Sequence, residues 1–103
     1  MDISKKQRLP SEIISIHRQE ILDLLDCYKA SNIQVFGSVA RSQDKVGSDI
    51  DLLVELPSGM SLLQRIDIEQ RLSDICNCSF DVVKPNEIPN GIKERILAEA
   101  RPL

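Results

Sequence analysis

Residues 35–55, with the sequence VFGSVARSQDKVGSDIDLLVE, constrain this chain more than any other stretch. Two short apolar runs, one ending at Phe36 and one starting at Ile50, are joined by a polar segment that begins with a glycine. Alternate residues of a strand share a face, so Asp49 and Asp51 point to the same side of the second run. The stretch therefore predicts two strands whose connection brings a pair of carboxylates close to a glycine turn.

The rest of the chain predicts helices around these strands. Apolar residues at three- and four-residue steps predict an amphipathic helix over residues 10–30. The other expected elements are strands over 33–36 and 49–55, about one turn of helix over 38–42, a helix over 61–76, a strand over 80–83, and a last helix, capped by Asn90 or Gly91, that ends near Ala100. Residues 1–9 are expected to be a flexible tail.

The order of these elements predicts an α/β (α+β) fold, with a small mixed sheet of about three strands flanked by helices. The chain has 103 residues, so residues 10–103 are expected to form a single domain. The helix over 61–76 is expected to bury one apolar side, formed by Leu62, Leu63, Ile66, Leu72 and Ile75. The last helix is expected to turn Ile92, Ile96 and Ala100 inward.

Composition argues against several classes of protein. The net charge of −3 and the 3% aromatic content do not suit a protein that binds nucleic acid. No apolar stretch approaches the roughly 18 residues of a membrane span, so a membrane protein is not expected. The chain has three cysteines, an odd number, and none of them forms a CxxC motif: Cys27, Cys76 and Cys78. Because it also has only one histidine, the sequence supports neither a zinc cluster nor a disulfide framework. We expect reduced thiols in a cytoplasmic protein.

The acidic pair suits divalent cations. Same-face neighbours on a strand lie about 6.6 Å apart, so Asp49 and Asp51 can each contribute oxygens to two ions about 3.5–4 Å apart, as in phosphoryl transfer. Mg²⁺ prefers such oxygen ligands. Asp81 lies inside an apolar strand, where an unpaired buried carboxylate would be costly. It is therefore the candidate third carboxylate, able to complete the second ion site and to accept a proton from the attacking group.

The glycine turn suits a phosphate group. Gly37 allows the backbone to approach a triphosphate closely, and Ser38 offers a hydroxyl and an amide. Arg41 adds a positive charge one turn later. Each of these signals is weak alone, because a glycine after a strand is commonly a turn, a serine is commonly a cap, and an exposed Asp-x-Asp is commonly a solvated strand face.

Together, however, the residues read Gly-Ser, then ten residues, then Asp-x-Asp. This pattern resembles the signature of the nucleotidyltransferase superfamily that has the DNA polymerase β type of catalytic domain. The stretch GSVARSQDKVGSDIDLLVEL is similar almost throughout to the minimal nucleotidyltransferase (MNT) group, small proteins that consist of little more than this domain. In the later FDVV strand, Asp81 matches the third carboxylate of that family.

The resemblance implies an activity and a partner. Small members of this group are typically encoded beside an all-helical HEPN-domain toxin, bind it as its antitoxin, and can transfer AMP from ATP to one of its tyrosines. For this chain it implies that Asp49, Asp51 and Asp81 hold two Mg²⁺ ions. It also implies that Gly37 and Ser38 bind the triphosphate of ATP, with Arg41 as a further contact.

Three alternatives stay open at this point. The same fold could block the toxin by complex formation without catalysis. An enzyme of this family could also use another acceptor, such as a tRNA end or a small hydroxylated compound. Finally, the acidic strand face could simply be solvated, as in a generic α/β domain; this reading leaves Asp81, inside an apolar strand, unexplained.

Overall fold

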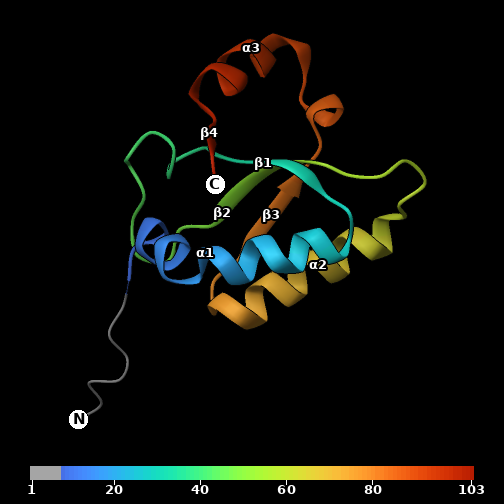
Figure 1. Ribbon diagram of the computed structural model, residues 1–103. Coiled ribbons are helices and arrows are strands. Elements are labelled where there is room, and N and C mark those ends of the chain that lie inside the picture. The colour runs from blue at the N-terminus through green and yellow to red at the C-terminus, as the bar shows by residue number, and fades with distance from the viewer. Residues whose placement is uncertain (1–7) are drawn as a thin grey trace.

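The computed structural model of the protein describes residues 8–103, in which three helices accompany a four-stranded sheet (Figure 1). The expected tail falls mainly on residues 1–7, which lie outside the described residues. The elements in chain order are α1 (Pro10–Cys27), β1 (Ser31–Phe36), β2 (Ile50–Glu55), α2 (Leu62–Cys76), β3 (Phe80–Val83), the short 3₁₀ helix η2 (Pro85–Glu87), α3 (Asn90–Glu99) and β4 (Arg101–Pro102). The predicted fold class, a mixed sheet with helical cover, is confirmed.

The sheet has the strand order β3-β2-β1-β4. β1 pairs with β2 in the antiparallel direction, and β2 pairs with β3 in the parallel direction. β4 was not expected; it adds two residues to the free edge of β1, where Val35 pairs with Arg101, and Leu103 N donates a hydrogen bond to Ile33 O at 3.0 Å. The last residues of the chain are therefore tied to the strand that leads into Gly37.

One face of the sheet is covered by α1 and α2, which lie side by side (Figure 1). Ile50, Leu52 and Val54 of β2 face these helices and have no exposed surface. The helices contribute the fully buried side chains Ile21, Leu25, Ile68 and Leu72 to the same core. Burial of such a side chain contributes about 1.5–3 kcal/mol each, so this face carries most of the stability of the domain.

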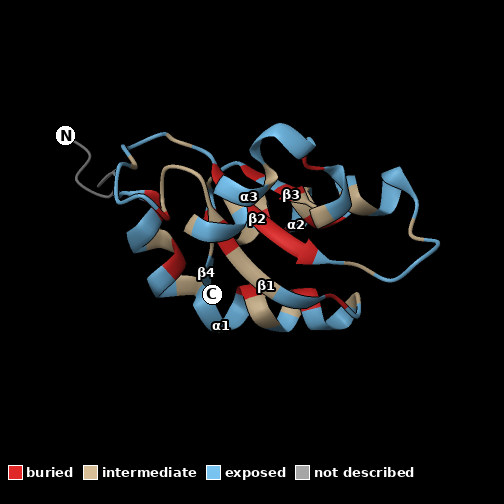
Figure 2. Cartoon of the chain, turned by 90° about the horizontal axis from the view of Figure 1, so that it is seen from above, coloured by how far each residue is buried: buried red, intermediate tan, exposed pale blue. Residues whose placement is uncertain are grey.

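The opposite face of the sheet is only partly covered. Leu53 of β2 and Ile88, just after η2, are buried there, outside the cluster that packs against α1 and α2. α3 lies on this side and has no fully buried residue (Figures 1 and 2). Polar side chains of β2 and β3 on this face can therefore reach solvent.

The prediction of which residues of α2 are buried is wrong for three of the five residues named. Leu62, Leu63 and Ile66 are 62%, 76% and 48% exposed. The buried residues of α2 are Ile68, Leu72 and Cys76, which recur at four-residue steps. At about 100° per residue, the three exposed residues lie about 120–160° around the helix from Ile68. The helix has two apolar stripes, and only one of them faces the sheet.

Three further expectations about the helices differ from the structure. α1 ends at Cys27 rather than near Ala30, because Lys29 adopts a positive φ of 61° that stops the helix. Residues 38–42 form turns and no regular helix. α3 begins at Asn90 after Pro89, without a side-chain cap, and Ile92 is 39% exposed instead of turned inward.

All three cysteines are free thiols, as expected, with Cys76 buried and Cys27 exposed. Burial raises the pKa of the Cys76 thiol to about 11, which makes it a weak nucleophile. None of the helices found in residues 8–103 is long and apolar enough to cross a membrane.

Leu72→Ala should lower the free energy of unfolding by about 2–5 kcal/mol, because it leaves a cavity where a fully buried side chain packs. Leu63→Ala is the matched control and should change the free energy of unfolding by less than about 0.5 kcal/mol, because residue 63 is exposed. Urea denaturation of both variants measures the two values. A larger loss in Leu63→Ala than in Leu72→Ala would show that the helix buries the other stripe.

Candidate functional site

The pairing of β2 with β3 brings two of the three predicted carboxylates together. Asp51 and Asp81 are direct register partners in this parallel pair. Neighbouring strands lie about 4.8 Å apart, and paired residues point to the same side, so both carboxylates stand on the partly covered face of the sheet. Asp49 lies just before β2 and, two residues from Asp51, belongs to the same face.

The three acids differ in exposure. Asp51 is half-buried, whereas Asp49 and Asp81 are exposed. The expectation that Asp81 is costly because it is buried is therefore wrong. β3 forms one edge of the sheet and alternates buried and open positions, so its aspartate reaches solvent while Phe80 and Val82 fill the core. An aspartate in an apolar strand did not by itself require a ligand.

Gly37 fits closely against Asp51. It has a positive φ of 74°, which side chains of L-residues rarely adopt. A Cβ at this position would overlap Oδ2 of Asp51 and lie 3.3 Å from its Cγ. The turn after β1 and the start of β2 are thus packed so closely that only glycine leaves room for the carboxylate.

The predicted phosphate contacts lie on the turn that follows Gly37. Ser38 is half-buried, and its carbonyl accepts the N–H of Gln43 at 2.8 Å. The amide of Arg41 donates to Gly37 O at 3.1 Å, which closes the turn. These bonds hold the backbone of residues 37–43 in a compact loop at the end of β1.

Arg41 is held by Glu99, a residue that was not predicted to belong to the site. Its Nη1 donates to Oε2 of Glu99 at 2.9 Å, and its Nε donates to Oε1 of Gln43 at 3.2 Å. The Glu99 side chain is only 16% exposed, at the last residue of α3. A single glutamate in an amphipathic helix carries no sequence signal for this role, since its partner lies 58 residues away.

The electrostatics of the site centre on Asp51. Burial is the largest cause that raises the pKa of Asp51 to about 6, and the carboxylates of Asp81 and Asp49 add to the shift. The Arg41 guanidinium opposes it. Repulsion among like charges and loss of hydration are the two penalties that a bound cation would relieve.

These residues fit Mg²⁺ in their chemistry. Asp49, Asp51 and Asp81 offer carboxylate oxygens, the donors that this ion prefers. Within residues 8–103, no three His, Cys, Asp or Glu side chains already converge on a single metal position. Mg²⁺ is usually bound by one or two carboxylates together with substrate phosphates and water, so a preformed three-ligand cage is not required. The set therefore suits an ion that arrives with a phosphate ligand.

The chain resembles known proteins over most of its length. The family model described as "Polymerase beta, Nucleotidyltransferase" matches residues 9–103. "Putative protein adenylyltransferase MJ1217" of Methanocaldococcus jannaschii is 37% identical over 89 residues, 86% of this chain and 91% of that protein. "Protein adenylyltransferase MntA" of Thermococcus cleftensis is 32% identical over 87 residues, 84% of this chain and 85% of that protein.

Solved structures show the same fold. A structure described as a putative minimal nucleotidyltransferase has a TM-score of 0.78 at 32% identity, and the match covers 90% of this chain and 95% of that one. One chain of a structure described as the tri-AMPylated Shewanella oneidensis HEPN toxin in complex with MNT antitoxin gives a TM-score of 0.66 at 19% identity, and the match covers 85% of this chain and 69% of that one.

Gly37→Ala should destabilise the fold more than Gly47→Ala. Both glycines have positive φ, 74° and 88°, so each substitution should cost about 1 kcal/mol in backbone strain. Only at residue 37 does the new Cβ meet Asp51, whereas nothing lies within 4 Å of residue 47. We expect an additional loss of about 1 kcal/mol for Gly37→Ala in chemical denaturation, because the Asp51 carboxylate must rotate away from the new Cβ.

The matching test is Asp51→Ala in the Gly37→Ala background, which should recover that additional loss because the overlapping group is gone. Equal destabilisation by Gly37→Ala and Gly47→Ala, or no recovery in the double variant, would show that the contact is not energetically important.

Asp51→Asn should stabilise the metal-free protein at pH 7.5. The pKa of Asp51 lies above its ordinary value of 3.8, so the stabilisation that its proton supplies is complete below about pH 4 and is lost as the pH rises through about 6. The full pKa shift of Asp51 would correspond to about 3 kcal/mol in the free energy of unfolding. Because the carboxylate is partly exposed, solvent screening reduces the gain expected for Asp51→Asn to about 1 kcal/mol.

Thermal unfolding in EDTA at pH 7.5 and pH 4 measures this gain, which should shrink at the lower pH as Asp51 of the wild type takes up its proton. Asp74→Asn, an exposed aspartate on α2, serves as the control and should change little. A destabilised Asp51→Asn variant at pH 7.5 would contradict the proposed crowding of carboxylates.

Proposed function

The chain belongs to the polymerase beta, nucleotidyltransferase family, and from that premise we propose that it transfers AMP from ATP to a tyrosine hydroxyl of a HEPN-domain toxin and so acts as its antitoxin. The observation that carries the proposal is the arrangement of the Gly37 turn against Asp51, with Asp81 beside it. It places a tight glycine turn and a group of carboxylates at one point of the sheet. A nucleoside triphosphate with a divalent cation suits both parts.

The names of relatives support a protein as the acceptor. Two relatives that this chain matches over most of their length carry the names "Putative protein adenylyltransferase MJ1217" and "Protein adenylyltransferase MntA". In the Shewanella oneidensis complex, which shares the fold, the HEPN toxin is AMPylated and is bound to MNT antitoxin. We infer the same kind of acceptor here, a helical HEPN-domain protein. Three free thiols suit a reducing cytoplasm as the place of this reaction.

In this proposal Asp49, Asp51 and Asp81 hold Mg²⁺, which would neutralise charge that develops on the α-phosphate and on the departing pyrophosphate. Gly37 allows the backbone to approach the triphosphate, and Ser38 offers its amide and hydroxyl. Arg41, already near Asp51, contributes a positive charge to the phosphates.

The transfer step is a substitution at phosphorus. The tyrosine oxygen forms a bond to the α-phosphorus of ATP, the bond between that phosphorus and the bridging oxygen breaks, and pyrophosphate leaves. The proton of the hydroxyl passes to Asp81, whose exposed carboxylate stands where an acceptor from another protein can reach it. Asp51 is half-buried and less accessible to a bulky acceptor.

Replacing Asp49 and Asp51 together by asparagine should abolish AMP transfer, with a fall of about 10³-fold or more, since both cation binding and charge stabilisation are lost. The assay is intact-mass measurement of the HEPN-domain partner after incubation with ATP and Mg²⁺. Asp74→Asn, remote from the site on the exposed side of α2, should transfer as fast as the wild type.

The same assay separates catalysis from simple complex formation. If the wild type binds the partner tightly but adds no mass, the chain is a non-catalytic antitoxin. A double variant that labels the partner at the wild-type rate would remove Asp49 and Asp51 from the mechanism. Circular dichroism of the double variant checks that the fold is retained.

A further inference from the structure

A second surface lies at the other end of the sheet. The first turns of α2 expose Leu62, Leu63 and Ile66, three of the eight large apolar residues that are exposed among residues 8–103. The other five are scattered over the chain: Leu9, Ile16, Val46, Ile92 and Leu97. Single exposed apolar residues are normal, whereas three within five residues form a patch of the kind found at protein interfaces.

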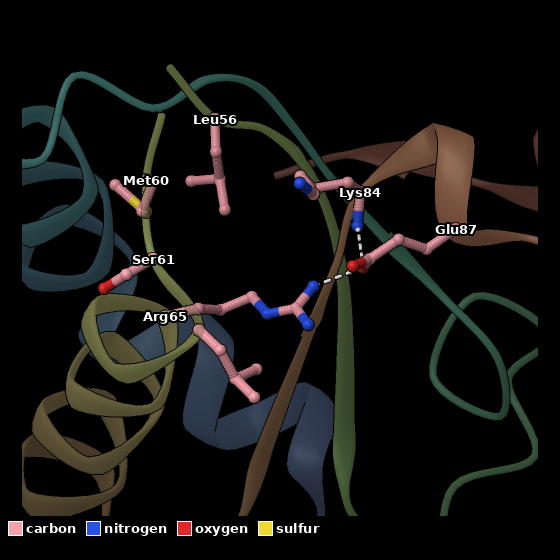
Figure 3. A pocket seen from close by; sticks show the side chains of 7 residues that line it. Leu56, Met60, Ser61, Arg65, Lys84 and Glu87 are labelled. Carbon is pink, nitrogen blue, oxygen red and sulfur yellow. Dashed lines mark hydrogen bonds and ion pairs between the residues drawn. The ribbon is translucent and has the colours of Figure 1, made fainter. Parts of the chain in front are cut away.

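A pocket of about 160 Å³ adjoins this patch (Figure 3). Leu56, Met60 and Leu62 form its apolar side, and Arg65, Lys84 and Glu87 form its charged side. Leu62 belongs to both the pocket and the patch, so the two are continuous. We call the patch and pocket together the α2 surface.

The charges of the α2 surface favour an acidic partner. Arg65 forms an ion pair with Glu87, which also accepts the backbone N–H of Lys84 (Figure 3). The Lys84 ammonium forms no ion pair with any residue in the part of the chain that the structure describes. The rim therefore carries one positive charge in excess, on a chain whose net charge is −3.

The start of α2 adds to this local positive potential. Ser61 accepts the N–H of Gln64 at 3.1 Å as the helix cap, but the first turn contains no acidic residue. In α1, by contrast, Glu12 stands in the first turn. A carboxylate from another molecule would be stabilised beside the free first-turn amides and Lys84.

We propose that the α2 surface is the docking site of the acceptor protein, which places an apolar side chain in the pocket and an aspartate or glutamate beside Lys84. This inference rests on the proposed function, because it assigns a surface to the protein that receives AMP. The apolar patch supplies the buried area, and the excess positive charge selects an acidic segment rather than a second copy of this patch, which would bring like charges together.

The α2 surface and the acids lie at opposite ends of β2, four residues or about 13 Å apart at the rise of a strand. The apolar patch lies on α2, on the face of the sheet opposite the acids, whereas Lys84 and Glu87 bring the pocket to the end of the sheet. A standard interface covers about 800 Å² on each partner. The acceptor must therefore bend around this end of the sheet to bring its hydroxyl to the carboxylates.

Leu63→Asp tests the apolar patch, and Lys84→Glu tests the charge. The probe is a purified HEPN-domain protein, the acceptor of the proposed function; calorimetry gives its Kd, and transfer at saturating ATP gives its KM and kcat. Each variant should raise Kd and KM for the probe about tenfold or more, with kcat changed less than about twofold. Leu63→Asp should fold, because residue 63 is 76% exposed and an acid suits the first turn of a helix.

Ile16→Asp is the matched control, since Ile16 is 53% exposed on α1 and lies outside the α2 surface. It should leave Kd and KM unchanged. Wild-type affinity in both Leu63→Asp and Lys84→Glu would overturn the docking site, as would an equal loss in Ile16→Asp. A wild-type dimer in sedimentation that Leu63→Asp dissociates, with KM unchanged, would assign the surface to a second copy and also overturn the inference.

Failure of the proposed function looks different. If the wild type binds the probe but transfers no AMP, the reaction is wrong, while a tenfold loss of binding in Leu63→Asp still supports the docking site. If the wild type transfers AMP and the variants bind and transfer like it, the reaction stands and the docking site is wrong. A wild type that does not bind the probe at all contradicts both.

Discussion

The side chain of Asp51 can occupy its position only because residue 37 has no Cβ. A side chain there would overlap the carboxylate, so the turn at the end of β1 and the start of β2 are fitted to each other. The contact places a compact loop of backbone, residues 37–43, beside a half-buried acid. Asp81 then joins the pair through the register of β2 with β3. Burial, followed by the neighbouring carboxylates of Asp81 and Asp49, raises the pKa of Asp51, and a bound cation would relieve both penalties.

The rest of the fold supplies the stability that offsets the unfavourable proximity of these carboxylates. α1 and α2 form nearly all of the apolar core with one face of the sheet, so the domain does not need the other face for its stability. α3 buries no residue completely and leaves the acids in contact with solvent. Its last residue, Glu99, holds Arg41 near the site, and β4 anchors the following residues to β1. The end of the chain thus helps to position a residue of the proposed nucleotide site.

The elements with a clear period were predictable from the sequence. Alternation in β2 and the three- and four-residue steps of α1 predict the correct type of structure, and the motif predicts a pair of carboxylates close to the turn at Gly37. The predicted buried side of α2 was wrong because the helix carries two apolar stripes. Hydrophobicity alone does not show which stripe packs against the sheet, and in the structure it is the stripe that contains Ile68. β4 has two residues and no period. The ion pair of Arg41 with Glu99 joins residues 58 positions apart and depends on the tertiary fold alone.

The central claim is that a nucleoside triphosphate with Mg²⁺ binds at the acidic end of β2 rather than at the basic pocket near Lys84. The most direct measurement is a heteronuclear NMR titration of the isotopically labelled chain with a nonhydrolysable ATP analogue and Mg²⁺. The account predicts the largest amide shifts at residues 37–41, 49–51 and 81, with little change near residues 61–65 and 84. The largest shifts at the pocket, or no localised shift at all, would contradict it.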